Sequence, residues 1–91
     1  MVKRKVTQII DGDTFKVTGG KAIRLAEVRA PEKGTRSGAQ AKHDLRKLIE
    51  GKTVDYNTVG KSYGRDVAKV KVNKKSINQT MRNKGYKNKG R

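Results

Sequence analysis

The spacing of a small number of apolar residues constrains the fold of this chain more than any other feature. Val, Ile, Leu and Phe together account for 18 of the 91 residues, which is about the 20% level below which a highly charged chain stays disordered. These residues nevertheless recur at the periods of strands and helices. The sequence therefore predicts one small folded domain of modest stability.

Five segments have the composition of β-strands. The first three are rich in β-branched residues and are short, and Gly19-Gly20 predicts a hairpin turn between the second and the third. In the fifth segment, apolar residues alternate with lysines, so one face packs while the other carries charge. The five expected strands are residues 2–10, 14–17, 21–28, 53–59 and 66–73.

Two further segments have the period of a helix. Apolar residues at spacings of four, three and one predict a helix over residues 38–50, ended by Gly51. Residues 76–83 predict a short closing helix, with Ser76 as its N-cap and Gly85 just beyond its end.

The order of these elements predicts a mainly β fold with two short helices, in the α+β class. Five strands, with one helix between the third and fourth and a second helix at the end, match the five-stranded OB-fold barrel, which binds oligonucleotides on one face. Phe15 and Tyr56 are expected to pack inside the barrel. We expect the domain to span residues 1–85, and residues 86–91, which have no apolar period, to form a flexible basic tail.

The charge of the chain predicts a polyanionic partner. It carries 24 Lys and Arg against 8 Asp and Glu, a net charge of +16, and each phosphate that such a surface neutralises releases counterions. DNA or RNA is therefore expected. A membrane is not, because the sequence has neither an apolar stretch of spanning length nor a long amphipathic basic helix.

Several kinds of chemistry are excluded by what the chain lacks. It has no Cys, which removes disulfides, thiolate metal sites and thiol nucleophiles. Its single His, His43, lies in the first expected helix, so a site built on paired histidines is excluded as well. No apolar stretch follows the basic N-terminal residues, so we expect no signal peptide, which leaves a cytoplasmic protein and the mature form of a secreted one as alternatives.

Half of the acidic residues lie in the first third of the sequence, although carboxylates there do not increase the affinity of a protein for a polyanion. Four of the eight, Asp11, Asp13, Glu27 and Glu32, fall within the first 32 residues. The sequence Asp11-Gly12-Asp13-Thr14 offers two carboxylates and a hydroxyl, which are the oxygen ligands that Ca²⁺ or Mg²⁺ requires. The alternative for this segment is an ordinary Asp-Gly turn.

Taken together and in order, several short motifs resemble the thermonuclease family of staphylococcal nuclease-like (SNase-like) domains. The resemblance runs from about residue 6 to residue 85. The motifs are Asp11-Gly12-Asp13-Thr14-Phe15, Ile23-Arg24-Leu25, Ala30-Pro31-Glu32, Gly51-Lys52-Thr53-Val54 and Tyr63-Gly64-Arg65.

The resemblance implies an endonuclease activity and assigns roles within it. Members of the family are monomers that use Ca²⁺ to hydrolyse DNA and RNA phosphodiester bonds with little sequence preference. By this resemblance Asp13, with Asp11 nearby, is the metal ligand. Glu32 is the general base for the attacking water, and Arg24 and Arg65 hold the phosphate.

The remaining expected nucleic-acid contacts are cationic or phenolic. Tyr63 matches a phosphate-contacting tyrosine of the family, and we add Lys61 and Arg29 as further nucleic-acid contacts. Only three Tyr, one Phe and no Trp are present, whereas single-strand binders gain about 1 to 3 kcal/mol per base stacked on an aromatic ring. Contacts to the phosphate backbone are therefore expected to dominate.

Residue 29 departs from the family pattern. Arg29 stands where the family has a second calcium-binding Asp, and a unit charge 4 Å away is worth about 4 kcal/mol at an effective dielectric constant of 20. Three outcomes remain open: the metal binds weakly through Asp13, Asp11 and substrate phosphate, the Arg29 side chain swings away, or Arg29 acts as a third phosphate-binding cation. The alternative function is accordingly a catalytically weak or inactive nucleic-acid-binding OB module.

Overall fold

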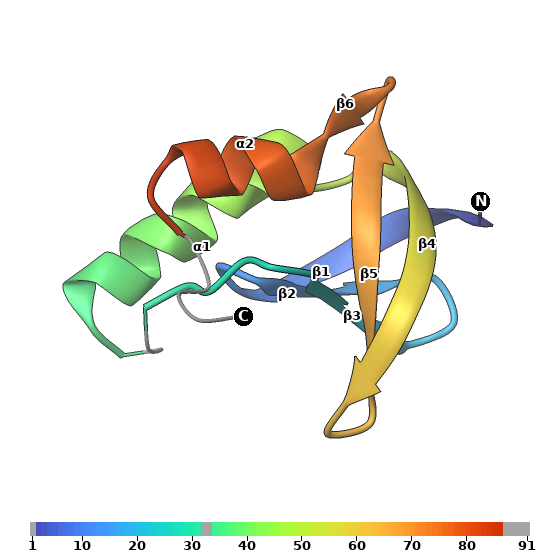
Figure 1. The fold of residues 1–91 in the computed structure, drawn as a ribbon, viewed down its shortest axis with the longest axis horizontal. Helices are drawn as coiled ribbons and strands as arrows, with labels where there is room; N and C mark the ends of the chain where they lie inside the picture. The colour runs from blue at the N-terminus through green and yellow to red at the C-terminus, as the bar shows by residue number, and fades with distance from the viewer. Residues whose placement is uncertain (1, 32–33, 87–91) are drawn as a thin grey trace.

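The computed structural model describes residues 2–31 and 34–86, and within them the predicted order of strands and helices is present (Figure 1). The elements are β1 (Val2–Asp11), β2 (Thr14–Val17), β3 (Lys21–Leu25), α1 (Arg36–Ile49), β4 (Thr53–Ser62), β5 (Arg65–Val72), β6 (Lys75–Ser76) and α2 (Ile77–Asn83).

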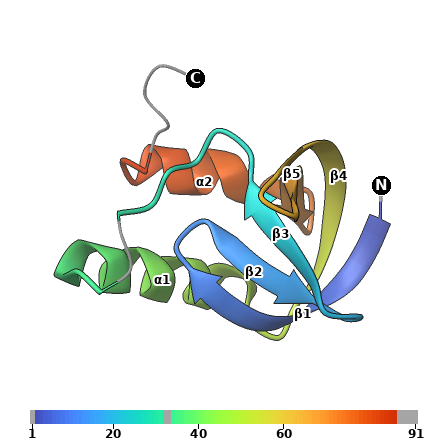
Figure 2. The ribbon, with the colours of Figure 1, turned by 90° about the horizontal axis from the view of Figure 1, so that it is seen from below.

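The strands form one sheet that curls into a closed barrel. Their order is β3-β2-β1-β4-β5-β6, and every neighbouring pair is antiparallel. An additional parallel pairing of β3 with β5, in which Arg24 lies opposite Val67, closes the sheet on itself. The predicted OB-fold of the α+β class is confirmed. Figure 2 shows α1 and α2 on the side of the barrel away from the N-terminus.

The main differences from the predicted strands are in β3, β4 and β6. β3 ends at Leu25 rather than at residue 28, because the chain turns there and Glu27 adopts a φ of 60°. β4 continues to Ser62, because an irregularity in its pairing with β5 after Thr58 bends the strand without ending it. The two-residue strand β6 was not predicted, since two residues carry no detectable period.

The first helix begins earlier than the sequence indicated. α1 starts at Arg36 because the Thr35 side chain accepts a hydrogen bond from the Gly38 amide at 2.9 Å and caps the helix. Ser76 caps α2 in the same way, as predicted, by accepting from the Gln79 amide at 3.1 Å. None of the helices in the described ranges is long and apolar enough to cross a membrane.

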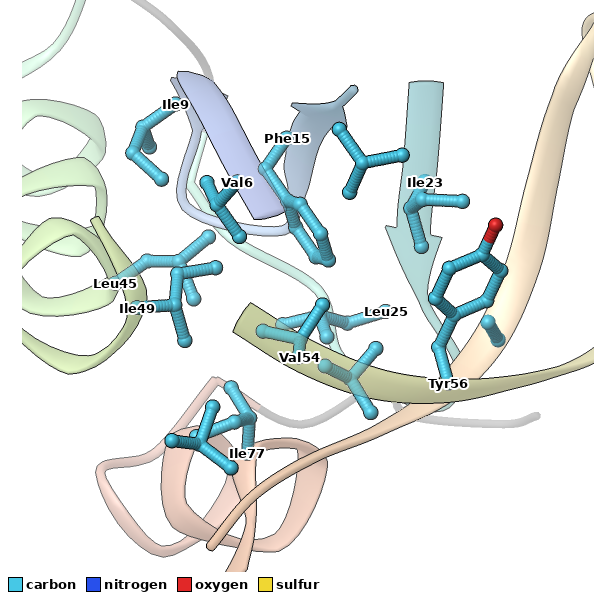
Figure 3. Packing of buried hydrophobic residues seen from close by; sticks show 14 of the residues in the cluster. Val6, Ile9, Phe15, Ile23, Leu25, Leu45, Ile49, Val54, Tyr56 and Ile77 are labelled. Carbon is cyan, nitrogen blue, oxygen red and sulfur yellow. The ribbon is translucent and has the colours of Figure 1, made fainter. Parts of the chain in front are cut away.

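The hydrophobic core fills the barrel and extends under both helices (Figure 3). Phe15 and Tyr56 lie within it, as predicted, at 0% and 2% exposure. α1 contributes Leu45 and Ile49, and α2 contributes Ile77, all nearly or fully buried. The apolar residues are therefore few, but the fold places most of them on one continuous interior surface.

One buried amide connects α2 to the barrel. Asn78 is 8% exposed, and its Oδ1 accepts a hydrogen bond from the Val70 amide at 2.7 Å. Its Nδ2 donates to the carbonyl oxygens of Ala26 at 2.9 Å and Ala68 at 3.1 Å. A single side chain thus satisfies backbone groups of β5 and of the turn that follows β3.

The end of α2 is fixed by a glycine and by the residue after it. Gly85 has a φ of 100° and donates its amide to the Arg82 carbonyl at 2.9 Å, while the Tyr86 amide donates to Met81 at 3.2 Å. This pair of bonds is a Schellman motif. Tyr86 packs against the core, and its hydroxyl donates to Asp44 Oδ2 at 2.7 Å. The remainder of the predicted tail, residues 87–91, lies outside the described residues, and the boundary at residue 85 stays a prediction.

Replacing the buried amide tests its part in holding the fold. Asn78→Ala is expected to lower the free energy of unfolding by about 3 kcal/mol, because buried backbone groups of Val70 and Ala26 lose their partner and each such loss costs roughly 1 to 3 kcal/mol. Denaturant titration of both proteins measures the change. Asn83→Ala, at the exposed end of the same helix, is the matched control, expected within about 0.5 kcal/mol of the parent. Equal losses in the two variants would contradict this account.

Candidate functional site

Three strand ends meet at one end of the barrel and bring distant residues together. Asp13 precedes β2, and Thr14 at the start of β2 pairs with Arg24 in β3. Arg24 in turn lies beside Val67 of β5 through the parallel pairing, and Arg65 begins β5. Residues separated by about fifty positions in the sequence therefore share one end of the barrel.

Asp13 is the centre of this group. Its side chain is 13% exposed, and its Oδ2 lies 3.7 Å from Arg24 Nη2 and accepts a hydrogen bond from the Ala30 amide at 3.3 Å. Its Oδ1 accepts from the Thr14 hydroxyl at 2.9 Å. Arg24 is itself oriented by donating from Nη2 to the Val28 carbonyl at 3.2 Å.

Thr14 links the second arginine to the same carboxylate. Its hydroxyl, which donates to Asp13, also accepts a hydrogen bond from Arg65 Nη1 at 3.3 Å. Arg65 Nε donates to the Ser62 carbonyl at 3.4 Å, which holds the guanidinium near the turn between β4 and β5. Thr14 is 1% exposed. The sequence suggested Thr14 as an oxygen ligand, whereas in this geometry its hydroxyl is occupied in joining Asp13 to Arg65.

Asp11 and Asp13 lie close together, which favours a positive charge beside them. Burial raises the pKa of Asp13, and the adjacent Asp11 carboxylate raises that pKa further, while hydrogen bonds from Thr14 and Ala30 act in the opposite direction. Asp11 Oδ1 accepts a hydrogen bond from the Asp13 amide at 3.2 Å, which places the two side chains on the same turn. A cation near this pair relieves both the burial cost and the repulsion between the two carboxylates.

Gly12 fixes the distance between this turn and α1. A Cβ added at Gly12 would lie 2.5 Å from the Ala41 Cβ and 2.7 Å from the Ala30 Cβ. The φ of Gly12 is not positive, so the glycine is needed for close packing and not for a left-handed turn. Ala30 and Ala41 therefore help to position Asp11 and Asp13. Sequence reasoning missed this role, because small residues at a close approach leave no periodic signal.

The other predicted site residues lie further from this group or outside the description. Tyr63 is 95% exposed in the β4–β5 turn, and Lys61 is exposed on the same hairpin. Arg29 has an exposed side chain, and its amide donates to the Tyr86 carbonyl at 3.1 Å. Glu32, the predicted general base, lies outside the described residues.

The ligands available to a metal ion are few but suitable. Within residues 2–31 and 34–86, no group of three or more His, Cys, Asp or Glu side chains could hold a metal ion. Asp11 and Asp13 supply two carboxylates on one turn. One or two carboxylates completed by substrate phosphate and water are a common arrangement for a hard divalent cation. The chain's donors therefore fit a cation shared with a substrate.

Comparisons with known proteins agree with the motifs. The family model described as staphylococcal nuclease homologue matches residues 22–89 of this chain. A protein of Haemophilus influenzae named "Uncharacterized endonuclease" is 40% identical over 86 residues, which cover 89% of this chain and 48% of that protein. The chain thus spans about half the length of this relative.

A methyl group at position 12 tests the close approach of α1. Gly12→Ala is expected to lower the free energy of unfolding by about 1 to 3 kcal/mol, since Ala30 or Ala41 must move to admit the new Cβ. Thermal or denaturant unfolding measures it. Gly60→Ala is the matched control, because Gly60 has an ordinary φ and open space around its Cβ position, and a change of at most about 0.5 kcal/mol is expected. A Gly12 variant as stable as the control would show that the turn and helix are not in close contact.

Proposed function

Because the chain belongs to the staphylococcal nuclease homologue family, we propose that it is a nuclease that hydrolyses DNA and RNA phosphodiester bonds with little sequence preference. The observation that supports this most directly is the convergence of two guanidinium groups on one partly buried acid. Arg24 lies 3.7 Å from Asp13, and Arg65 reaches it through the Thr14 hydroxyl.

In this proposal the two arginines bind the scissile phosphate. Attack at phosphorus builds negative charge on the equatorial oxygens, and planar guanidiniums can donate paired hydrogen bonds to them. Both are held by backbone carbonyls, Arg24 by Val28 and Arg65 by Ser62, so little reorganisation is needed when the charge develops. Donors fixed in advance in this way stabilise the transition state more than the ground state.

Asp13 and Asp11 would hold a divalent cation, for which we propose Ca²⁺. When bound there, such an ion supplies positive charge to the phosphoryl oxygens. The raised pKa of Asp13, which follows from burial and from Asp11, supports this placement because a nearby cation would favour its ionised form. Glu32 is the proposed general base, which takes a proton from the attacking water.

Two substitutions test these roles separately. Glu32→Gln and Arg65→Ala are each expected to lower cleavage of single-stranded DNA by at least about 100-fold, since a general base contributes roughly 10² to 10⁴ and a fixed donor roughly 10² to 10³. Cleavage is measured with millimolar Ca²⁺, with Mg²⁺ and with EDTA. The matched controls are Glu50→Gln and Arg46→Ala, which alter an exposed ion pair at the C-terminal end of α1. Full activity in both test variants would refute the assigned roles.

A second candidate function follows from Arg29. A cation with an exposed side chain stands where the family has its second metal-binding acid, so the barrel could bind nucleic acid without cleaving it. This alternative predicts binding that weakens steeply with salt and is indifferent both to Ca²⁺ and to Glu32. Binding without cleavage under all three metal conditions would favour it over hydrolysis.

Restoring an acid at position 29 tests the proposed metal site. Arg29→Asp is expected to tighten Ca²⁺ binding by at least about tenfold, or 1.4 kcal/mol, because a repulsive charge becomes an attractive one. Titration calorimetry with calcium chloride measures the affinity. Arg29→Ala, which only removes the cation, should lie between the parent and the Asp variant. Equal affinities in all three proteins would place the ion away from residue 29.

A further inference from the structure

A surface hollow of about 440 Å³ lies between the start of α1 and the end of α2. We call it the α1–α2 hollow. It is lined by residues of three separate segments, among them Pro31, Arg36, Gln40, Lys84 and Tyr86. Its volume is in the range of sites that bind small organic ligands. Figures 1 and 2 both show the start of α1 and the end of α2 at the same end of the molecule as the β1–β2 turn that carries Asp13.

The hollow begins one residue beyond the candidate site. Pro31, in its wall, directly follows Ala30, whose amide donates to Asp13 Oδ2 at 3.3 Å. We propose that the α1–α2 hollow binds one nucleotide of a nucleic-acid strand, next to the phosphate held at Asp13. This inference rests on the proposed function, and it adds a separate subsite that determines affinity for longer strands.

The charge of the hollow suits a phosphate group. Arg36 on α1 and Lys84 at the end of α2 are exposed, and neither belongs to any of the ion pairs found among residues 2–31 and 34–86. Asp44 adjoins the hollow through Tyr86, and both of its oxygens are occupied: Oδ1 accepts from Gln40 at 3.0 Å and Oδ2 from Tyr86 at 2.7 Å. Two cations therefore face a single acid that is already hydrogen-bonded.

Tyr86, in the wall of the hollow, is held by hydrogen bonds to three other parts of the fold. Tyr86 donates its amide to Met81 at 3.2 Å, accepts from the Arg29 amide at 3.1 Å and donates its hydroxyl to Asp44. Burial and the Asp44 carboxylate raise the pKa of Tyr86 to about 12, and its hydroxyl is bonded to Asp44. The Tyr86 ring and Pro31 provide apolar surface beside the two cations, and the hydrogen bonds of Tyr86 reduce the cost of ordering its ring on binding. A sugar and base attached to a phosphate meet both requirements, which a bare anion does not.

The experiment compares short and long substrates. The double variant Arg36→Ala/Lys84→Ala is expected to raise the KM for a ten-nucleotide single strand about tenfold and to lower the slope of log affinity against log salt by about 1. Its kcat should be unchanged, as should its rate on a nitrophenyl ester of a mononucleotide, which carries only the scissile bond. Lys74→Ala/Lys75→Ala, two exposed cations next to and in β6, is the matched control for lost charge.

Three results would contradict a nucleotide subsite in the α1–α2 hollow. An equal rise in KM in the control pair would show that the effect comes from the loss of positive charge anywhere on the surface. An equal loss of rate on the nitrophenyl ester would place Arg36 and Lys84 in the catalytic site. An equal loss of affinity for free thymidine 5′-phosphate would make the hollow a site for free nucleotides. Each of these overturns the inference.

A binding measurement separates this inference from the proposed function. Fluorescence anisotropy with a labelled ten-nucleotide strand in EDTA reports affinity even if the protein cleaves nothing. A weaker affinity confined to the Arg36/Lys84 pair supports the subsite whether or not hydrolysis is found. Unchanged affinity in that pair rejects the subsite while leaving the nuclease activity intact.

Discussion

The parallel pairing of β3 with β5 is the contact on which the candidate site depends. In the order β3-β2-β1-β4-β5-β6, these two strands are four positions apart, and four strand spacings in a flat sheet amount to roughly 19 Å. Closure of the barrel removes that separation and places Arg24 beside Val67. The seam is reinforced by Asp66, which accepts from Thr58 at 3.4 Å and lies 2.9 Å from Lys21 Nζ. The β2–β3 pairing already places Arg24 near Asp13, and barrel closure then brings Arg65, at the start of β5, to the same group.

The sequence predicts most of what depends on local period. The strand and helix positions follow from apolar spacing. Of the residues in the predicted site, the barrel brings together Asp11, Asp13, Arg24 and Arg65, while Glu32 lies outside the described residues. What the sequence does not reveal are the contacts made by single residues across the fold. A residue larger than glycine at position 12 would collide with Ala30 and Ala41. The Tyr86 hydroxyl binds Asp44 of α1, which lies 42 residues away in the sequence. Such roles depend on three-dimensional proximity, and no periodic pattern encodes them.

The excess of positive charge affects both the stability of the fold and its proposed binding to nucleic acid. Three ion pairs are found among the described residues, each using one acid, while the chain carries 24 Lys and Arg. Most cations therefore repel one another across a small surface, which opposes the compact state. A bound polyanion removes that repulsion and releases its own counterions. The same charges that limit the stability of the free protein would thus favour the proposed nucleic-acid complex.

The identity of residue 29 affects the net charge at the candidate site when a phosphate is bound there. A phosphate placed between Arg24 and Arg65 brings one negative charge to a region that already contains Asp11 and Asp13, so further positive charge is required there. In the proposed site, a divalent cation held by the two acids would meet that requirement, and so would the guanidinium of Arg29 if its exposed side chain turned toward the phosphate. The two solutions differ in geometry, because a metal polarises an oxygen that it ligates directly, whereas a guanidinium acts through hydrogen bonds. In the proposed mechanism, an arginine in place of an acid at position 29 would therefore shift the compensating charge from a metal toward a guanidinium.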